Sequence, residues 1–303
     1  EQNRNEPQRV IGIVKFFDSF KGWGFFVTSG KGIRRNLEEG RLISLHITSS
    51  EWKSSSDPRD NEWVVFSPRS NSRGWSAINA KRLEYSREDL LVAMKYRGKY
   101  ARINGTDNKG DSFDENVLCH IIRRMTVRRR DGITRYSAPT PSFDTERFQD
   151  VIDCFCDFVS QKSEHKRESL IKEFLDDISL NKLLFTVFTE GEYVTDDETK
   201  KAIYSQFKDI LVNHLFETDK LDDLSVLPST FDYTPYADKL VAILVNEAKH
   251  NSVVVERWIN ERNIIDIISL QNSDVETIPL RLILQGKSGN TAWLDDLASD
   301  WSA

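Results

Sequence analysis

The chain has 303 residues, of which 39% are hydrophobic and 30% charged, a composition typical of a soluble protein with two or three domains. No apolar run approaches the roughly 20 residues of a membrane helix, and the polar segment 1–9 does not resemble a signal peptide, so we expect no membrane partner and a cytoplasmic location. Three cysteines are too few, and odd in number, for a disulfide framework, which favours a reducing compartment.

The net charge of -6 is unevenly distributed along the chain. Residues 1–85 carry 14 Lys and Arg against 10 Asp and Glu, residues 86–142 carry 12 against 7, and residues 143–303 carry 16 against 31. A basic front half fits a polyanionic partner, whereas an acidic back half repels one. The two halves are therefore expected to have different functions.

Residues 10–84 predict a small barrel. Five short segments are rich in β-branched and aromatic residues, and Gly, Ser, Asn, Asp and Pro gather between them. These segments are 10–17, 23–28, 42–47, 63–67 and 75–83. Five short strands without intervening helices favour a five-stranded antiparallel β-barrel over a βαβ unit.

Residues 85–142 predict a basic helical connector. The segments 86–89 and 112–115 both match the capping box that opens a helix. The second box predicts a helix from Ser112 to about Arg130. The proline-containing stretch 134–141 predicts a linker.

Residues 143–303 predict an acidic α-helical domain, either a bundle or a helical array. Apolar residues recur at helical spacing through most of this region. The segment 195–198 and the pair Thr234-Pro235 are typical of helix starts. Two apolar stripes are expected, one of Phe148, Val151, Ile152, Phe155 and Val159, and one of Leu170, Phe174, Leu175 and Ile178.

The most specific motif lies in the predicted barrel. Segment 12–26 reads G-I-V-K-F-F-D-S-F-K-G-W-G-F-F and resembles the cold-shock domain family, whose pattern there is G-x-V-K-W-F-N-x-x-K-G-F-G-F-I. Segment 43–47, I-S-L-H-I, resembles the family's V-F-V-H-F, and segment 73–79, R-G-W-S-A-I-N, resembles its closing strand. The three matches come in the right order over residues 10–84. The resemblance implies an OB-fold barrel of the cold-shock type that binds single-stranded RNA or DNA.

The chemistry of this segment points the same way. Trp23 and Phe25 are two residues apart on a strand and therefore share one face. Lys15 and Lys21 flank them with positive charge. Rings that stand between cations can stack on unpaired bases, each worth ~1–3 kcal/mol, while the ammonium groups lie near phosphates. We therefore expect a binding face at these four residues.

The resemblance adds further site residues. Phe16 takes the place of the family's stacking Trp, and His46 and Arg73 match positions that contact nucleic acid in the family. Phe17 and Phe26 are instead expected in the barrel core.

Three departures from the family pattern weaken the expected binding. Ser44 and Ile47 stand where the family has two stacking phenylalanines, and Asp18 stands where it usually has Asn. Two lost platforms at ~1–3 kcal/mol each predict a lower affinity.

Basic residues outside the motif are candidates for auxiliary phosphate contacts. They are Arg34, Arg35, Arg124, Arg128 and Arg129. The alternative for the last three is a set of solvated cations, favoured at the end of the predicted helix by its dipole.

No catalytic, metal or cofactor site is expected. P-loop, Rossmann, nucleophile-elbow and zinc-protease patterns do not occur in the sequence. Cys154 and Cys156 lie among phenylalanines at a spacing unsuited to paired zinc ligands, so buried thiols are expected.

Three functional hypotheses follow. In the first, the barrel binds single-stranded RNA or DNA, for example as an RNA chaperone, and the acidic helical region contacts a protein partner. In the second, the barrel is degenerate and the chain is a scaffold within a multiprotein complex. In the third, a nucleic-acid-processing enzyme has its site in the helical region. A final helix that carries Trp293, Leu297 and Trp301 either docks on its own domain or recognises a partner protein.

Overall fold

The computed structural model describes residues 8–34, 41–95, 101–106, 112–128, 142–143, 145–190 and 193–262. The chain divides into two compact units, Glu1–Ile210 and Leu211–Ala303. The first unit contains the barrel, the connector and the helices that follow it. The division into domains 10–84, 85–142 and 143–303 stays a prediction.

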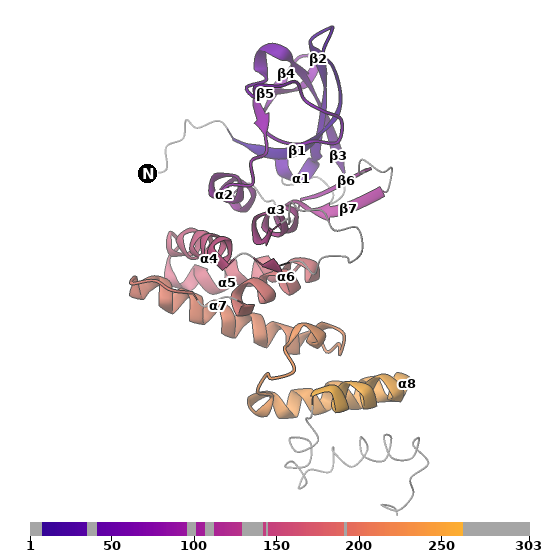
Figure 1. Ribbon diagram of the computed structural model, residues 1–303, viewed down its shortest axis with the longest axis vertical. Coiled ribbons are helices and arrows are strands. Elements are labelled where there is room, and N and C mark those ends of the chain that lie inside the picture. The colour runs from indigo at the N-terminus through magenta and orange to yellow at the C-terminus, as the bar shows by residue number, and fades with distance from the viewer. Residues whose placement is uncertain are drawn as a thin grey trace, which may run out of the picture. The chain divides into compact units, whose positions relative to one another are not determined.

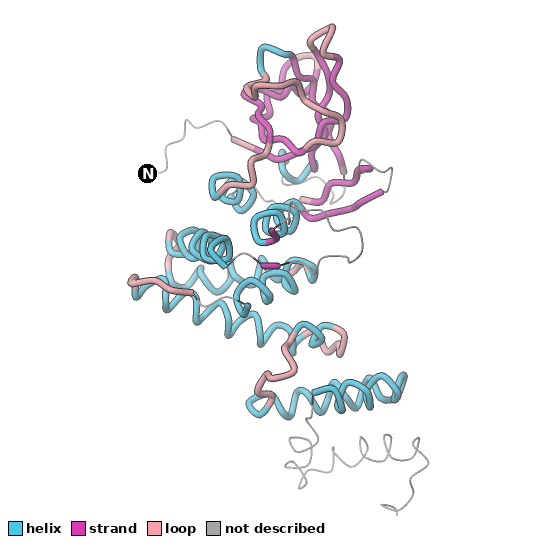
Figure 2. Tube along the Cα trace, viewed as in Figure 1, coloured by secondary structure: helices cyan, strands magenta, loops and turns pink. Residues whose placement is uncertain are grey.

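The predicted five-stranded barrel is confirmed (Figures 1 and 2). Around the barrel the strands follow the order β1-β2-β3-β5-β4, and β4 pairs again with β1, an arrangement consistent with an OB-like fold. The short helices α1 (Gly30–Ile33) and η1 (Ser49–Glu51) lie in the connections. The strands are β1 (Val10–Asp18), β2 (Trp23–Ser29), β3 (Leu42–Thr48), β4 (Trp63–Asn71) and β5 (Gly74–Arg82).

One strand pair departs from the expected antiparallel arrangement. β3 and β5 run parallel, with His46 opposite Ser76, while the other pairs are antiparallel. The reason is topological, because a closed ring with an odd number of strands cannot alternate direction at every pairing.

The interior of the barrel is apolar because alternate strand residues point inward. Phe26 is fully buried there, and Phe17 packs against the same cluster, so both lie in the core as expected. Ile47 is also fully buried in this core. The interpretation of Ile47 as a substituted stacking position is therefore wrong, since its side chain faces the interior.

The connector begins as predicted. Helix α2 (Arg87–Lys95) starts at its capping box, where Ser86 and Asp89 exchange side-chain hydrogen bonds with each other's backbone N–H.

The second predicted capping box is wrong. The segment Ser112–Asn116 is strand β7, paired with β6 (Arg102–Thr106), and helix α3 spans only Val117–Thr126. Asn116 caps this helix, because its Oδ1 accepts hydrogen bonds from the N–H groups of Leu118 and Cys119. Strand β8 (Val127–Arg128) follows and pairs with β9 (Ser142–Phe143). The predicted linker 134–141 lies outside the described residues.

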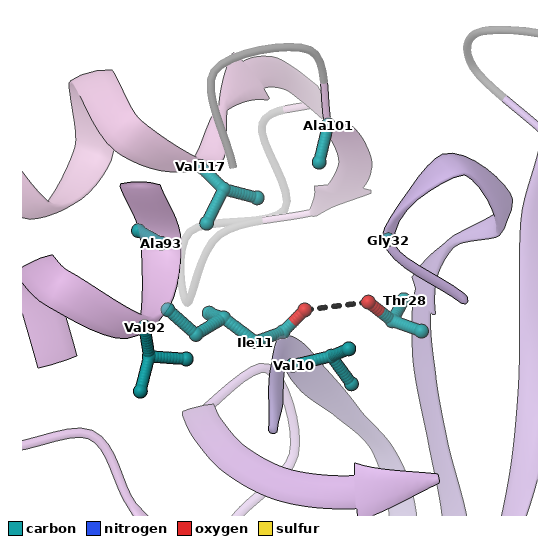
Figure 3. A pocket seen from close by; sticks show the side chains of 8 residues that line it. All are labelled: Val10, Ile11, Thr28, Gly32, Val92, Ala93, Ala101 and Val117. Carbon is teal, nitrogen blue, oxygen red and sulfur yellow. Dashed lines mark hydrogen bonds between the residues drawn. The ribbon is translucent and has the colours of Figure 1, made fainter. Parts of the chain in front are cut away.

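Helices α2 and α3 pack against one end of the barrel. Residues of β1, β2, α1, α2 and α3, together with Ala101 just before β6, line a small and mostly apolar cavity, where the Thr28 hydroxyl donates to the carbonyl of Ile11 at 2.5 Å (Figure 3). The cavity encloses about 10 Å³, barely the space of one water molecule, so it is a packed joint rather than a ligand site. Its lining consists of Val10, Ile11, Thr28, Gly32, Val92, Ala93, Ala101 and Val117.

A layer of helices follows the connector in the first unit. They are α4 (Thr145–Ser160), α5 (Glu164–Leu175), α6 (Ile178–Glu190) and the first part of α7 (Glu198–Glu217). The first predicted stripe is buried on α4. The second is wrong at Ile178, which begins α6 and is 41% exposed. Asp197 caps α7 by accepting hydrogen bonds from two backbone N–H groups.

The second unit contains the end of α7, η2 (Asp223–Val226), η3 (Thr234–Tyr236) and α8 (Ala237–Arg262). Thr234 and Pro235 open η3 directly before α8, close to the predicted helix start. Every helix within the described ranges is too short or too polar to traverse a lipid bilayer. Trp293, Leu297 and Trp301 lie outside those ranges.

Candidate nucleic-acid interface

Four of the predicted site residues form one cluster on the outer wall of the barrel. Phe16, Trp23, Phe25 and His46, here called the ring cluster, are all half-buried. Trp23 and His46 stack with centroids 6.1 Å apart, and Phe25 meets His46 at 5.6 Å. Phe16 lies 5.3 Å from Trp23 and 5.9 Å from Phe25. The rings support one another at fixed angles while part of each remains accessible.

The strand register extends this cluster around the whole barrel. Phe16 is paired with Phe25, Phe25 with His46, His46 with Ser76, and Ser76 with Arg69. Because directly paired residues project from the same face of a sheet, these five form one cross-strand row over β1, β2, β3, β5 and β4. The row is aromatic at one end and carries an exposed cation, Arg69, at the other.

Two local features place Phe16 beside Phe25. The register shifts between Val14 and Phe16, so Lys15 sits at a bulge, exposed to solvent. Gly24 pairs with Phe17 just beyond this bulge, and a Cβ atom there would lie 2.3 Å from the Phe16 carbonyl oxygen. The absence of a side chain at Gly24 therefore lets β1 and β2 approach closely enough for the rings to meet.

The turn that joins β1 to β2 carries the second predicted lysine. Lys21 Nζ lies 3.5 Å from Asp18 Oδ2 in a solvent-exposed ion pair, which contributes little stability. The backbone N–H of Lys21 bonds to Asp18 and, with the lysine charge and the N–H of Phe20, lowers the pKa of that carboxyl. An Asn at this position could accept the same hydrogen bonds without the charge. The departure at Asp18 thus keeps the turn and adds a negative charge beside the face.

The two arginines nearest the polar end of the row lie on β4 and the turn after it. Arg73 is exposed in the β4–β5 turn, where its N–H donates to Asn71 Oδ1. Arg69 was not predicted, because the sequence reading ends the strand at Ser67, before Pro68. Extending the inward–outward alternation through Pro68 would have found it. Ser44 is exposed on the same side of β3 as His46, so a small side chain leaves open space there.

The helices of the connector pack away from the ring cluster. They contact β1 at Val10 and Ile11, while Phe16 lies six residues from Val10 along the same strand. At 3.2–3.4 Å per residue this separation is about 20 Å. The joint of Figure 3 and the ring cluster therefore belong to opposite ends of the β1–β2 hairpin.

Two of the candidate auxiliary arginines contact rings outside the ring cluster. The Arg34 guanidinium lies 5.3 Å from the ring centroid of Trp75, which packs on the core side of β5, opposite Ser76. Arg124 lies 5.8 Å from the ring of Tyr85, near α3. Arg128 belongs to β8. Arg35 and Arg129 lie outside the described residues. The phosphate contacts expected of all five auxiliary arginines stay predictions.

The expected burial of the thiols is confirmed. Cys119, Cys154 and Cys156 are all buried, and burial raises the pKa of each to about 12. At neutral pH they are therefore protonated and unreactive.

No protein-family model matches the chain, and no similar sequence is found among curated proteins. The OB-like barrel thus rests on the structure, and the cold-shock resemblance rests on the motifs alone.

Proposed function

We propose that this protein binds single-stranded RNA or DNA on the outer wall of its barrel. The observation that carries the proposal is the cross-strand row, in which Phe16, Phe25 and His46 lead to Ser76 and Arg69, with Trp23 packed beside the aromatic end. Accessible rings next to cations suit unpaired bases and their phosphates, because every base has a face that can stack.

The motifs support the same function. Segments 12–26, 43–47 and 73–79 resemble the cold-shock domain family, and the first two of them contain Phe16, Trp23, Phe25 and His46. A cold-shock-type barrel would hold a strand unpaired, as an RNA chaperone does. Ser44 offers no ring on which a base can stack. Its presence should weaken binding by ~1–3 kcal/mol relative to a barrel with an aromatic residue there.

The acidic region 143–303 has a separate proposed role. Its charge disfavours contact with a polyanion, so we assign it to a protein partner. The proposed function needs no catalysis or cofactor, and a cytoplasmic location fits the reduced thiols.

A second candidate function is that of a scaffold with a degenerate barrel. Ser44 and Asp18 favour it, since one removes a ring and the other adds a negative charge beside Lys21. This alternative predicts that the full chain binds no oligonucleotide.

The test is a fluorescence-anisotropy titration of the full chain against a labelled single strand and the matching duplex. Replacing both Trp23 and Phe25 by Ala removes two platforms of ~1–3 kcal/mol each, so affinity for the single strand should fall at least about 30-fold. Phe158→Ala, a half-buried ring on α4, is the control and should bind normally. Thermal melting establishes that the double variant is folded. Unchanged affinity in that variant would reject this face.

A further inference from the structure

One aromatic ring stands apart from the ring cluster. Phe20, in the turn between β1 and β2, is 99% exposed. Single exposed apolar side chains are common on protein surfaces, so this exposure shows only that the whole ring is accessible to a ligand. In the cold-shock pattern this position has no set residue, so the motif does not account for the ring.

The turn that carries Phe20 is held by several hydrogen bonds. Asp18 Oδ1 accepts from the N–H groups of Phe20 and Lys21 at 3.1 Å and 3.0 Å. The N–H of Gly22 bonds to the Asp18 carbonyl at 2.8 Å, and the Gly22 carbonyl accepts from Ser49 at 2.9 Å. Gly22 has a φ of +70°, a conformation that glycine adopts readily. The backbone beneath Phe20 is therefore preorganised, which lowers the ordering cost of binding through its ring.

The position of Phe20 continues the binding face towards the tip of the hairpin. Phe20 is three residues from Trp23, which places their Cα atoms at most about 11 Å apart. Along the hairpin, Phe25, Trp23 and Phe20 follow one another in the direction of the turn. Lys21 stands next to Phe20 with its side chain 63% exposed, in reach of a phosphate that follows a stacked base.

We propose that Phe20 is a separate stacking site for an additional nucleotide of the bound strand, beyond those held by the ring cluster. This inference rests on the proposed function. A single exposed ring beside lysine suits one base and its phosphate. A protein partner would instead favour a contiguous apolar patch, and the other large hydrophobics that are exposed among the described residues of the first unit lie on β3 and in the helical layer.

The experiment measures affinity against oligonucleotide length. Homopolymeric thymidine and uridine strands of increasing length are titrated against the full chain and its Phe20→Ala and Phe20→Leu variants. Both variants should bind the longer strands about 5- to 150-fold more weakly, the range of one lost stacking contact. The shortest strand that still binds should be held equally well by all three proteins. Phe20→Tyr should restore binding, and Ser19→Ala, in the same turn, should have no effect.

Four results would overturn the proposal. If the Phe20 variants lost the same affinity for strands of every length, Phe20 would act as part of the ring cluster or by holding the cluster in place. Normal binding by Phe20→Leu would show an apolar contact without stacking. No loss at any length, with the Trp23 and Phe25 double variant still defective, would exclude Phe20 and leave the proposed function intact. Absence of binding by the unaltered chain would refute both.

Discussion

Arg69 offers the most specific prediction from the register. It lies at the cationic end of the cross-strand row, opposite Ser76 and exposed on β4. It has no ion-pair partner within the residues that the structure describes. If it contacts one phosphate, its removal should release one fewer counterion on binding. For a single strand, the slope of log affinity against log salt should become shallower by about 0.7.

That slope converts into a direct observation. Affinity should fall for both proteins between 50 and 200 mM salt. The fold-loss for Arg69→Gln should be about 2.6 times smaller than the fold-loss for the unaltered chain. The assay is anisotropy with one labelled single strand at four salt concentrations. Arg59→Gln is the matched control, because Arg59 is exposed, carries the same charge and lies in the loop before β4. An unchanged slope for Arg69→Gln, or an equal change for Arg59→Gln, would refute the assignment of the row.

Three further predictions concern contacts that hold the fold together. Gly24→Ala should destabilise the chain by about 1–3 kcal/mol or more and impair single-strand binding, because its Cβ would lie 2.3 Å from the Phe16 carbonyl oxygen. Asn116→Ala should lower the free energy of unfolding by about 0.5–2 kcal/mol, since it removes the cap of α3. Although burial acts to raise the pKa of Asp153, hydrogen bonds from Lys200, Arg87 and Tyr193 outweigh it and lower that pKa. Its carboxylate therefore stabilises the fold above its unfolded pKa of about 3.9, and this contribution is lost as the pH falls through the folded-state value. Asp153→Asn should lower the free energy of unfolding by about 1 kcal/mol at pH 7. When the pH is lowered from 7 to 3, this variant should lose less stability than the unaltered chain.

Urea denaturation followed by tryptophan fluorescence measures all three, with matched controls. Gly32→Ala should be tolerated, since its nearest neighbour to a Cβ would be 3.8 Å away. Asn104→Ala, exposed on β6, should leave stability unchanged. A stable Gly24→Ala protein, a neutral Asn116→Ala or an equal acid sensitivity of Asp153→Asn would each contradict the corresponding contact.

The barrel was predictable because its signals are local. Alternating apolar residues and turn residues predict the strands to within a few positions, and two of the three motif segments contain the four rings of the ring cluster. The end of β4 was missed because Pro68 reads as a break, although it pairs with Ala77 inside the strand. Arg69 was therefore not among the predicted site residues.

The connector was not predictable from local signals. Ser112 to Glu115 match a capping box, yet they form a strand because β6 is available to pair with them. Gly105 permits this pairing, since a Cβ there would lie 2.7 Å from the ring of Phe113 across the hairpin. A contact between segments ten residues apart in sequence thus overrode a helix-start pattern. Ile178 was missed for a different reason, because the helical spacing of apolar residues continues across the break between α5 and α6.

The most direct test of the central claim is photocrosslinking of the full chain to a single strand, followed by mapping of the tryptic peptides. Stacking on the ring cluster predicts crosslinks in peptides 16–21, 22–31 and 42–53, and their loss when an excess of unlabelled single strand, but not duplex, competes. Crosslinks confined to residues 85–262, or none that single strands displace, would contradict binding on the outer wall of the barrel.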